Sequence, residues 1–354
     1  MAWVESQRHA GTDRRTRPRA DERRRALWQA HRQGTQTAGI TGRGDRRSPY
    51  LFLMKRTEPF DFYQPTTLAE ASRLLKENGP GGRFLAGGTD LVIALKEKGL
   101  LPKYLVDLKR VPGLTGIREK SDGSITIGAL TTMREIETAP LITKKYPFLA
   151  QSAAEVGSIQ IRNRATIGGN MANATPSADT APALIALNAS AKIVGLNGER
   201  TVALEDFFKG PGQTVMSADE ILTEIAIAKT DPRLVGDYIK FSPREMMDLA
   251  YVGIAVAYNL KDNRCDGVRI VLGAVAPTPL RAKRAEAVLE GQTLSEALAD
   301  RSGQLASEEA KPISDVRSSA DYRRAMVGAM TKRALLNAAV GPVTAWVERR
   351  DRRY

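Results

Sequence analysis

Histidine and cysteine are almost absent from this sequence of 354 residues. Both histidines, His9 and His31, lie in the first 53 residues, and the only cysteine is Cys265. From Met54 onward these absences exclude histidine-based acid–base catalysis, a Ser-His-Asp triad, a His/Cys zinc site and an iron–sulfur cluster bound by this chain alone. One cysteine also excludes an intramolecular disulfide, which predicts a reducing, cytoplasmic location.

Long apolar runs are missing as well. No run approaches the roughly 18 apolar residues that span a bilayer, so the sequence predicts a soluble protein without a membrane span. The length is sufficient for two or three domains, each with its own core. The formal net charge is +13, and it is unevenly distributed.

Residues 1–53 carry twelve arginines, no lysine and five acidic residues. Their apolar residues follow no helical or strand period, which predicts a disordered, arginine-rich extension. A nucleic-acid-binding arm and a targeting peptide are the functional alternatives. Against them, no folded basic module follows, and Asp13, Asp21 and Glu22 interrupt the positive charge. We therefore interpret the extension as functionless, with translation starting at Met54, and predict no nucleic-acid partner.

From Met54 the chain has a mixed α/β pattern. A capped helix begins at Thr67, and a strand at Arg83–Leu85 leads through a Gly-Gly turn into a helix that begins near Thr89 or Asp90. Further strands are predicted at 103–109, 123–129 and 220–228, helices at 149–156 and over APALIALNA, and a hairpin centred on Asn197-Gly198.

The pattern changes after Asp231-Pro232, which reads as a break. Longer antiparallel strands are predicted in YIKFS, LAYVGIAVAYNL and DGVRIVLGAVAP, then helices at Leu280–Leu289 and Tyr322–Leu336. In the last helix Tyr322, Met326 and Met330 share one face, which predicts core packing. The predicted organisation is an extension at 1–53, an α/β domain at 54–231, an α+β domain at 232–340 and a basic tail at 341–354.

Two glycine loops stand out, LAGGTDL at Leu85–Leu91 and ATIGGNMA at Ala165–Ala172. Each ends or follows an apolar run that reads as a strand, and each sets Gly-Gly beside a hydroxyl residue and an Asp or Asn. Glycine lets backbone amides approach an anion without a Cβ atom in the way. Either loop alone could be an ordinary Gly-Gly turn. The two together predict a clamp that holds one pyrophosphate from two sides. Neither loop has the Rossmann or P-loop pattern.

The segments FLAGGTDL, IGALTTMREIE, GSIQIRNRATIGGNMANATPSAD and FSPREMMDLAYVGIAVA resemble the FAD-binding subunits of molybdenum hydroxylases. That family includes xanthine dehydrogenase and aerobic carbon monoxide dehydrogenase, and the resemblance runs from about Met54 to Ala339 in order, without large gaps. It implies an α/β (α+β) fold: a PCMH-type FAD-binding domain of two subdomains with FAD between them, then a C-terminal domain with a small antiparallel sheet and helices.

The resemblance also implies an oxidoreductase that is one subunit of a heterotrimer. In such a complex a large molybdopterin subunit hydroxylates the substrate and a small subunit carries two [2Fe–2S] clusters. The FAD of this chain then reduces an acceptor such as NAD, oxygen or a quinone. A histidyl-linked flavin is excluded from Met54 onward, so the FAD is expected to be noncovalent. The single cysteine cannot bind the extra [4Fe–4S] cluster of 4-hydroxybenzoyl-CoA reductase β subunits.

Two other functions stay open at this point. One is a stand-alone flavin oxidoreductase of the same superfamily, such as a relative of UDP-N-acetylenolpyruvoylglucosamine reductase. The other is a basic nucleic-acid-binding protein, which only the arginine-rich extension supports. Deleting residues 1–53 separates a flavoprotein from a tail-driven binder.

The resemblance carries cofactor contacts over to individual positions and implies no catalytic or metal-binding residue in this chain. Asp179 supplies a carboxylate, Val156 lies against the flavin or ribityl chain, and Leu222 is an apolar contact. Lys240 lies near the ring system, where it favours negative charge on the reduced flavin. The full set is Phe84, Leu85, Ala86, Gly87, Gly88, Thr89, Asp90, Leu91, Val156, Thr166, Ile167, Gly168, Gly169, Asn170, Asp179, Leu222 and Lys240.

The amides of Gly87, Gly88, Gly168 and Gly169 are expected to donate to phosphate oxygens, together with the hydroxyls of Thr89 and Thr166. Each of the other contacts has a structural alternative. Asp179 suits a helix cap, Val156 and Leu222 suit a core, and Lys240 suits a solvated strand. Arg162 and Asn163 either order the second loop or face a partner subunit.

Overall fold

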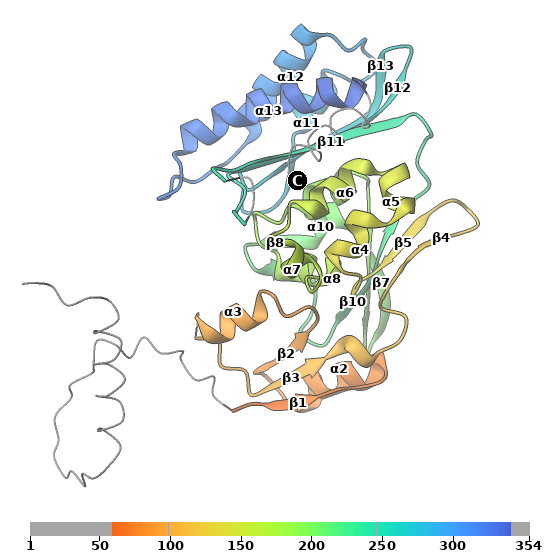
Figure 1. Ribbon diagram of the computed structural model, residues 1–354, viewed down its shortest axis with the longest axis vertical. Coiled ribbons are helices and arrows are strands. Elements are labelled where there is room, and N and C mark those ends of the chain that lie inside the picture. Colours follow the sequence, from red (N-terminus) through yellow and green to blue (C-terminus); the bar gives the residue numbers. More distant parts are fainter. Residues whose placement is uncertain (1–58, 98, 245–246, 341–354) are drawn as a thin grey trace, which may run out of the picture. The chain divides into compact units, whose positions relative to one another are not determined.

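The computed structural model describes residues 59–97, 99–244 and 247–340 (Figure 1). The chain divides into two units, 1–53 and 54–354, and every described residue belongs to the second. The predictions for the extension at 1–53 and the tail at 341–354 lie outside the described residues.

A three-stranded parallel sheet opens the described chain, in the order β1-β3-β2 (orange in Figure 1). Its strands are β1 (Asp61–Tyr63), β2 (Gly82–Leu85) and β3 (Tyr104–Asp107), the last followed by the 3-10 turn η1 (Leu108–Arg110). Helix α2 (Leu68–Glu77) joins β1 to β2, and its cap is as expected, because the Thr67 hydroxyl accepts from the Glu70 amide. The predicted order of strand, glycine loop and helix holds, with α3 (Leu91–Lys96) after β2.

A five-stranded antiparallel sheet follows, in the order β4-β5-β10-β6-β7. Its strands are β4 (Ile117–Glu119), β5 (Ile125–Gly128), β6 (Ser190–Gly195), β7 (Gly198–Ala203) and β10 (Ile221–Ile227). The predicted hairpin is present but its turn lies one residue earlier than expected: Gly195 pairs with Gly198, so Leu196 and Asn197 form the turn. A short two-stranded sheet lies between β7 and β10 in sequence, β8 (Phe208–Gly210) with β9 (Gln213–Thr214).

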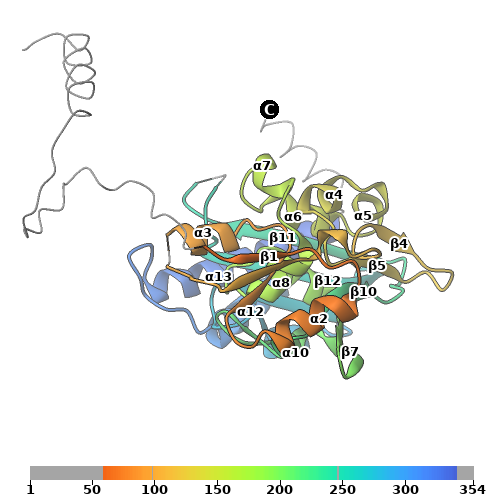
Figure 2. The ribbon, with the colours of Figure 1, turned by 90° about the horizontal axis from the view of Figure 1, so that it is seen from below.

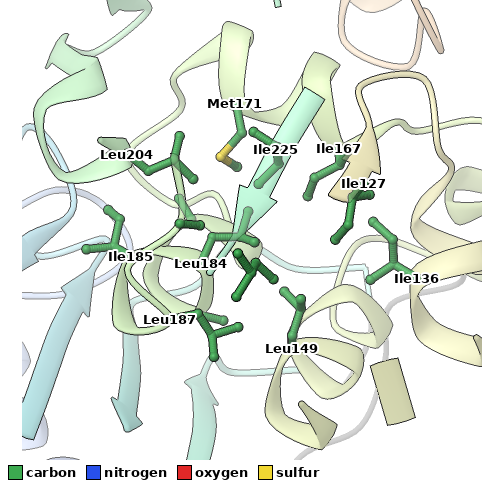
Figure 3. Close-up of a cluster of buried hydrophobic side chains, with 14 of the residues drawn as sticks. Ile127, Ile136, Leu149, Ile167, Met171, Leu184, Ile185, Leu187, Leu204 and Ile225 are labelled. Carbon is green, nitrogen blue, oxygen red and sulfur yellow. The ribbon is translucent and has the colours of Figure 1, made fainter. Parts of the chain in front are cut away.

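Short helices cover this sheet and form one core with it (Figure 3). Ile127 and Ile225 come from β5 and β10, and they meet side chains such as Ile136, Leu149 and Leu184 from the helices. The helices are α4 (Met133–Thr138), α5 (Pro140–Lys145), α6 (Pro147–Ala154), α7 (Ile159–Arg162), α8 (Ile167–Asn173), α9 (Thr180–Ala186) and α10 (Leu204–Phe207).

The second glycine loop does not follow a strand, contrary to expectation. Ser158 caps α7, and four residues after α7 ends Thr166 caps α8, its hydroxyl accepting from the Gly169 amide at 3.2 Å. Two hydroxyl caps in close succession favour two short helices over an extended run. Gly168 and Gly169 therefore lie in the first turn of a helix.

The C-terminal part has a four-stranded antiparallel sheet with a separate core (blue and cyan in Figure 1). The predicted long strands are present as β11 (Leu234–Phe241), β12 (Val252–Lys261) and β13 (Arg264–Gly273), and β14 (Leu280–Arg281) completes the sheet. Helix α13 (Ala320–Val340) packs on β11 and β12 and against α12 (Glu296–Glu309), which in turn packs on α11 (Lys283–Ala287).

Two predictions in this part are wrong. The helix expected at Leu280–Leu289 begins only at Lys283, because Leu280 and Arg281 pair with β13. Tyr322 is not a core residue: it is 48% exposed, while Met326 and Met330 are partly buried against the core. The buried stripe of α13 is displaced by one residue and runs through Arg323, Val327, Thr331, Ala334, Leu335 and Ala338.

The helical layer of the five-stranded sheet packs directly on the C-terminal sheet. Helix α6 lies beside β11 in both views of the ribbon (Figures 1 and 2), and the Gln151 side chain donates to the Tyr238 carbonyl at 2.7 Å. Helix α9 packs on β12 and β13. Among the described helices, not one combines the length and the apolar character that crossing a membrane requires.

Candidate functional site

The two glycine loops touch, although they lie far apart in the sequence. A Cβ atom on Gly87 would lie 2.0 Å from the carbonyl oxygen of Arg164 and 3.1 Å from the Cα atom of Ala165. A Cβ atom on Gly169 would lie 3.8 Å from that of Ala86. The first loop therefore rests directly on the backbone that enters the second, and only glycine at position 87 permits this approach.

The first loop offers backbone donors. Among the described residues, the amides of Gly87, Gly88 and Thr89 form no hydrogen bond within the chain. Gly88 has a φ of +80°, a left-handed conformation that favours glycine, and it turns the chain from β2 into α3. Successive unpaired amides in such a turn suit an anion.

The second loop differs from the expectation, because its amides bond within the protein. The Gly168 amide donates to the Ala129 carbonyl at 2.8 Å, and the Gly169 amide donates to the Thr166 hydroxyl. A Cβ atom on Gly168 would lie 2.6 Å from that of Ala129, so this glycine serves close packing. What the loop offers a ligand is the Thr166 hydroxyl hydrogen and the side-chain nitrogen of Asn170, whose Oδ1 already accepts from Thr180 at 2.7 Å.

Asp179 and Lys240 come together in a buried network. The two carboxylate oxygens of Asp179 accept from the Tyr238 hydroxyl at 2.8 Å and from the Lys240 ammonium at 3.0 Å. Lys240 also donates to the Glu155 carbonyl at 2.9 Å. Asp179 directly precedes α9 and makes no side-chain cap there, so its carboxylate is not a helix cap, and Lys240 is not a solvated strand residue.

Burial governs the protonation of this network. Asp179 is 7% exposed, and desolvation raises the pKa of its carboxyl to about 6 even though Lys240 and Tyr238 act in the opposite direction. The pKa of Tyr238 is raised well above 10 for the same reason, so the phenol stays a hydrogen-bond donor.

Val156 lies immediately beside this network. It follows Glu155 at the end of α6, and its carbonyl accepts from the guanidinium of Arg162 at 3.2 Å. Its side chain is partly buried against the core of the five-stranded sheet. Arg162 is 3% exposed and paired with Glu137, so it orders this segment and does not lie on an exposed face.

Leu222 belongs to the core. It lies on β10, 5% exposed, at a bulge where β10 changes register with β6. The bulge still connects to the second loop through the backbone: Ala129 donates to the Thr223 carbonyl and accepts from the Gly168 amide.

Three residues of this region were not predicted: Glu137, Thr180 and Tyr238. Tyr238 had a sequence signal, because it stands two positions before Lys240 on a predicted strand and therefore shares its face. Glu137 and Thr180 had none, since their partners Arg162 and Asn170 lie on other helices.

Comparison with known proteins follows the same division of the chain. Residues 58–230 match the family described as "FAD binding domain in molybdopterin dehydrogenase", and residues 237–338 match "CO dehydrogenase flavoprotein C-terminal domain". This chain belongs to that family of FAD-binding molybdenum hydroxylase subunits. The resemblance in the sequence motifs is thus confirmed, and with it the fold class, the oxidoreductase class and the FAD cofactor.

The chain matches individual relatives over nearly the whole of their length. The carbon monoxide dehydrogenase medium chain of Hydrogenophaga pseudoflava is 35% identical over 280 residues, which are 79% of this chain and 96% of the relative. The xanthine dehydrogenase FAD-binding subunit of Escherichia coli O157:H7 is 31% identical over 283 residues, 79% of this chain and 97% of the relative.

Solved structures agree. A structure of the Hydrogenophaga pseudoflava carbon monoxide dehydrogenase superposes with a TM-score of 0.77 at 35% identity and covers 80% of this chain and 98% of its own. Quinoline 2-oxidoreductase from Pseudomonas putida 86 superposes with a TM-score of 0.76 at 32% sequence identity. The match covers 81% of this chain and 99% of that chain. The relatives' names, such as medium chain and FAD-binding subunit, describe parts of larger enzymes.

The described residues of the two loops fit FAD. The unpaired amides of Gly87, Gly88 and Thr89 suit phosphate oxygens, and the loop that they contact carries the Thr166 hydroxyl and the Asn170 side chain. When bound, FAD supplies a redox group that can exchange one or two electrons.

Proposed function

We propose that this chain is the electron-transfer subunit of a molybdenum hydroxylase complex, with FAD held noncovalently between the two glycine loops. The observation that carries the proposal is the contact of Gly87 with the Arg164 carbonyl, which joins the loops into one surface. Membership of the FAD-binding family supports the same conclusion.

We assign a role in FAD binding to each loop from the hydrogen bonds that its groups make or leave open. The first loop, Phe84–Leu91, supplies backbone donors, and the second, Thr166–Asn170, supplies the Thr166 hydroxyl and the Asn170 side chain. Asp179 and Lys240 form the polar boundary of the site beside Val156, and Leu222 forms its apolar support. Because the Lys240 ammonium pairs with the Asp179 carboxylate, its charge is partly balanced before any flavin binds.

The proposed partners are a small [2Fe–2S] subunit, which delivers electrons, and a large molybdopterin subunit, which hydroxylates the substrate. NAD, oxygen or a quinone is the proposed acceptor. A cytoplasmic location is proposed from the unpaired Cys265. We also propose 54–231 and 232–340 as the two domains, since the family matches end at residue 230 and resume at residue 237.

Two experiments on the purified chain test the proposed FAD binding and the proposed complex separately. The full chain, reconstituted with FAD, should show flavin absorbance that is lost on denaturation, as expected for a noncovalent cofactor. Used as bait in its own cells, it should retain an iron–sulfur subunit and a molybdopterin subunit. Absence of flavin after reconstitution would refute the function, whereas flavin without partners would refute only the complex.

A further inference from the structure

The buried ion pair of Glu137 and Arg162 is not among the predicted flavin contacts. Arg162 Nε donates to Glu137 Oε2 at 2.8 Å, and both side chains are nearly fully buried. Burying two charges is costly unless their geometry and their further hydrogen bonds are good. Arg162 makes one such further bond, to the Val156 carbonyl at 3.2 Å.

Helix α4 and the residues just before it hold both ends of segment 162–167, which leads into the second glycine loop. At its start, the Met133 amide donates to the Ala165 carbonyl at 2.8 Å, and the Thr131 carbonyl accepts from the Ile167 amide at 3.0 Å. At its far end, Glu137 holds Arg162. The Arg164 carbonyl lies between these attachments and is the atom against which Gly87 packs.

The turn between α6 and α7 is also held from two sides. Lys240 of β11 donates to the Glu155 carbonyl, and Arg162 donates to the next carbonyl, that of Val156. Gly157, which follows, has a φ of +53° and leaves the turn without side-chain support of its own. Two buried cations, one from each domain, therefore define the path of the backbone at Val156.

We infer that Glu137 acts through Arg162 as a positioning unit for the flavin site, fixing Val156 and the spacing of the two glycine loops. The inference rests on the proposed assignment of Val156 and the loops to FAD. Arg162 reaches the α6–α7 turn through a backbone carbonyl, that of Val156, and neither member of the pair is among the predicted FAD contacts. A guanidinium suits this role because its planar fork reaches a carboxylate and a carbonyl at once.

A double-mutant design separates positioning from folding. Glu137→Gln leaves the Arg162 charge buried beside a neutral amide and should lower folding stability, whereas Glu137→Gln combined with Arg162→Met removes both charges and should recover much of it. FAD affinity should behave differently. In the double variant, as in Arg162→Met, no donor reaches the Val156 carbonyl, and affinity should stay about tenfold below that of the wild type.

Arg134→Met is the matched control. Arg134 also pairs with Glu137, at 2.9 Å, but its side chain is more exposed and makes no bond to the α6–α7 turn. This variant should keep FAD affinity and the visible circular dichroism of the bound flavin unchanged. Both should change in the Arg162→Met and double variants.

The measurements are FAD titration and visible circular dichroism on the full chain, alongside urea unfolding without FAD. Wild-type affinity in the folded double variant would overturn the inference. Should Arg162→Met not fold, Arg162→Lys decides, because an ammonium lacks the fork and should still lower FAD affinity; unchanged affinity there would also overturn it. A wild-type chain that binds no FAD would instead refute the proposed function.

Discussion

Gly87 packs so closely on Arg164 that a methyl group between them would lie 2.0 Å from the carbonyl oxygen. This contact joins β2 and its loop to the segment that leads into α8. The spacing of the two loops therefore depends on the absence of a side chain at position 87.

Gly87→Ala should therefore push the loops apart. We expect a loss of about 1–3 kcal/mol in folding stability from overpacking, and weaker FAD binding, measured by titration of the purified chain. Gly210→Ala is the control, because a Cβ atom there would meet only ordinary contacts, at 3.6 Å or more. Equal FAD affinity in Gly87→Ala and wild type would show that the loop spacing does not matter.

Asp179 should make folding stability fall as pH rises from about 4 to about 6. Its folded-state pKa, about 6, lies above its ordinary value of 3.8, so in this window the folded chain binds more protons than the unfolded chain. A shift of about two units corresponds to about 3 kcal/mol at most. Urea unfolding of the FAD-free chain across this range measures it.

Asp179→Asn should remove that component, since an amide does not titrate. The difference in stability between wild type and variant should then change between pH 4 and 6 and become constant above it. A difference that does not vary with pH would contradict the raised pKa.

Lys240→Met should extend the same window to higher pH, because its lower edge is set by the unfolded chain and only its upper edge by the folded-state pKa. The ammonium of Lys240 favours the ionised form of Asp179, so its removal should raise the pKa of that carboxyl further above 6. Lys209→Met, at an exposed position of β8, is the control and should leave the window in place. Urea unfolding midpoints measured between pH 4 and 8 distinguish the two variants. The same pH dependence of stability in Lys240→Met and Lys209→Met would show that Lys240 does not influence the pKa of Asp179.

Cys265 should resist thiol reagents in the folded chain. It is fully buried on β13, and burial raises the pKa of its thiol to about 11, so little reactive thiolate forms near neutral pH. Ellman's reagent should detect no thiol in native protein and one per chain in guanidinium chloride. Rapid reaction of the native chain would contradict the buried position.

Deleting residues 1–53 should leave FAD affinity unchanged, because the family match begins at residue 58. Any affinity for DNA should fall with the deletion and with rising salt, since the segment holds twelve arginines. FAD titration and a DNA-binding assay of both chains provide the test. Loss of flavin binding on deletion would overturn the interpretation of this segment as functionless.

The sequence by itself determined the features that depend on local chemistry. The cap at Thr67 placed the start of α2, and Asn197-Gly198 placed the hairpin to within one residue. The two glycine loops, together with the segments IGALTTMREIE and FSPREMMDLAYVGIAVA in the same order along the chain, indicated the family. The lack of histidine from Met54 onward excluded whole classes of chemistry without any structure.

Tertiary structure decided everything that depends on partners distant in sequence. Whether Gly168 donates to a phosphate or to Ala129 depends on where β5 lies, and the face of α13 that is buried depends on β11 and β12. Asp179 reads as a helix cap until β11 brings Tyr238 and Lys240 to it. Local pattern identifies which groups can bond, but burial and the geometry of packing choose among the bonds that are possible.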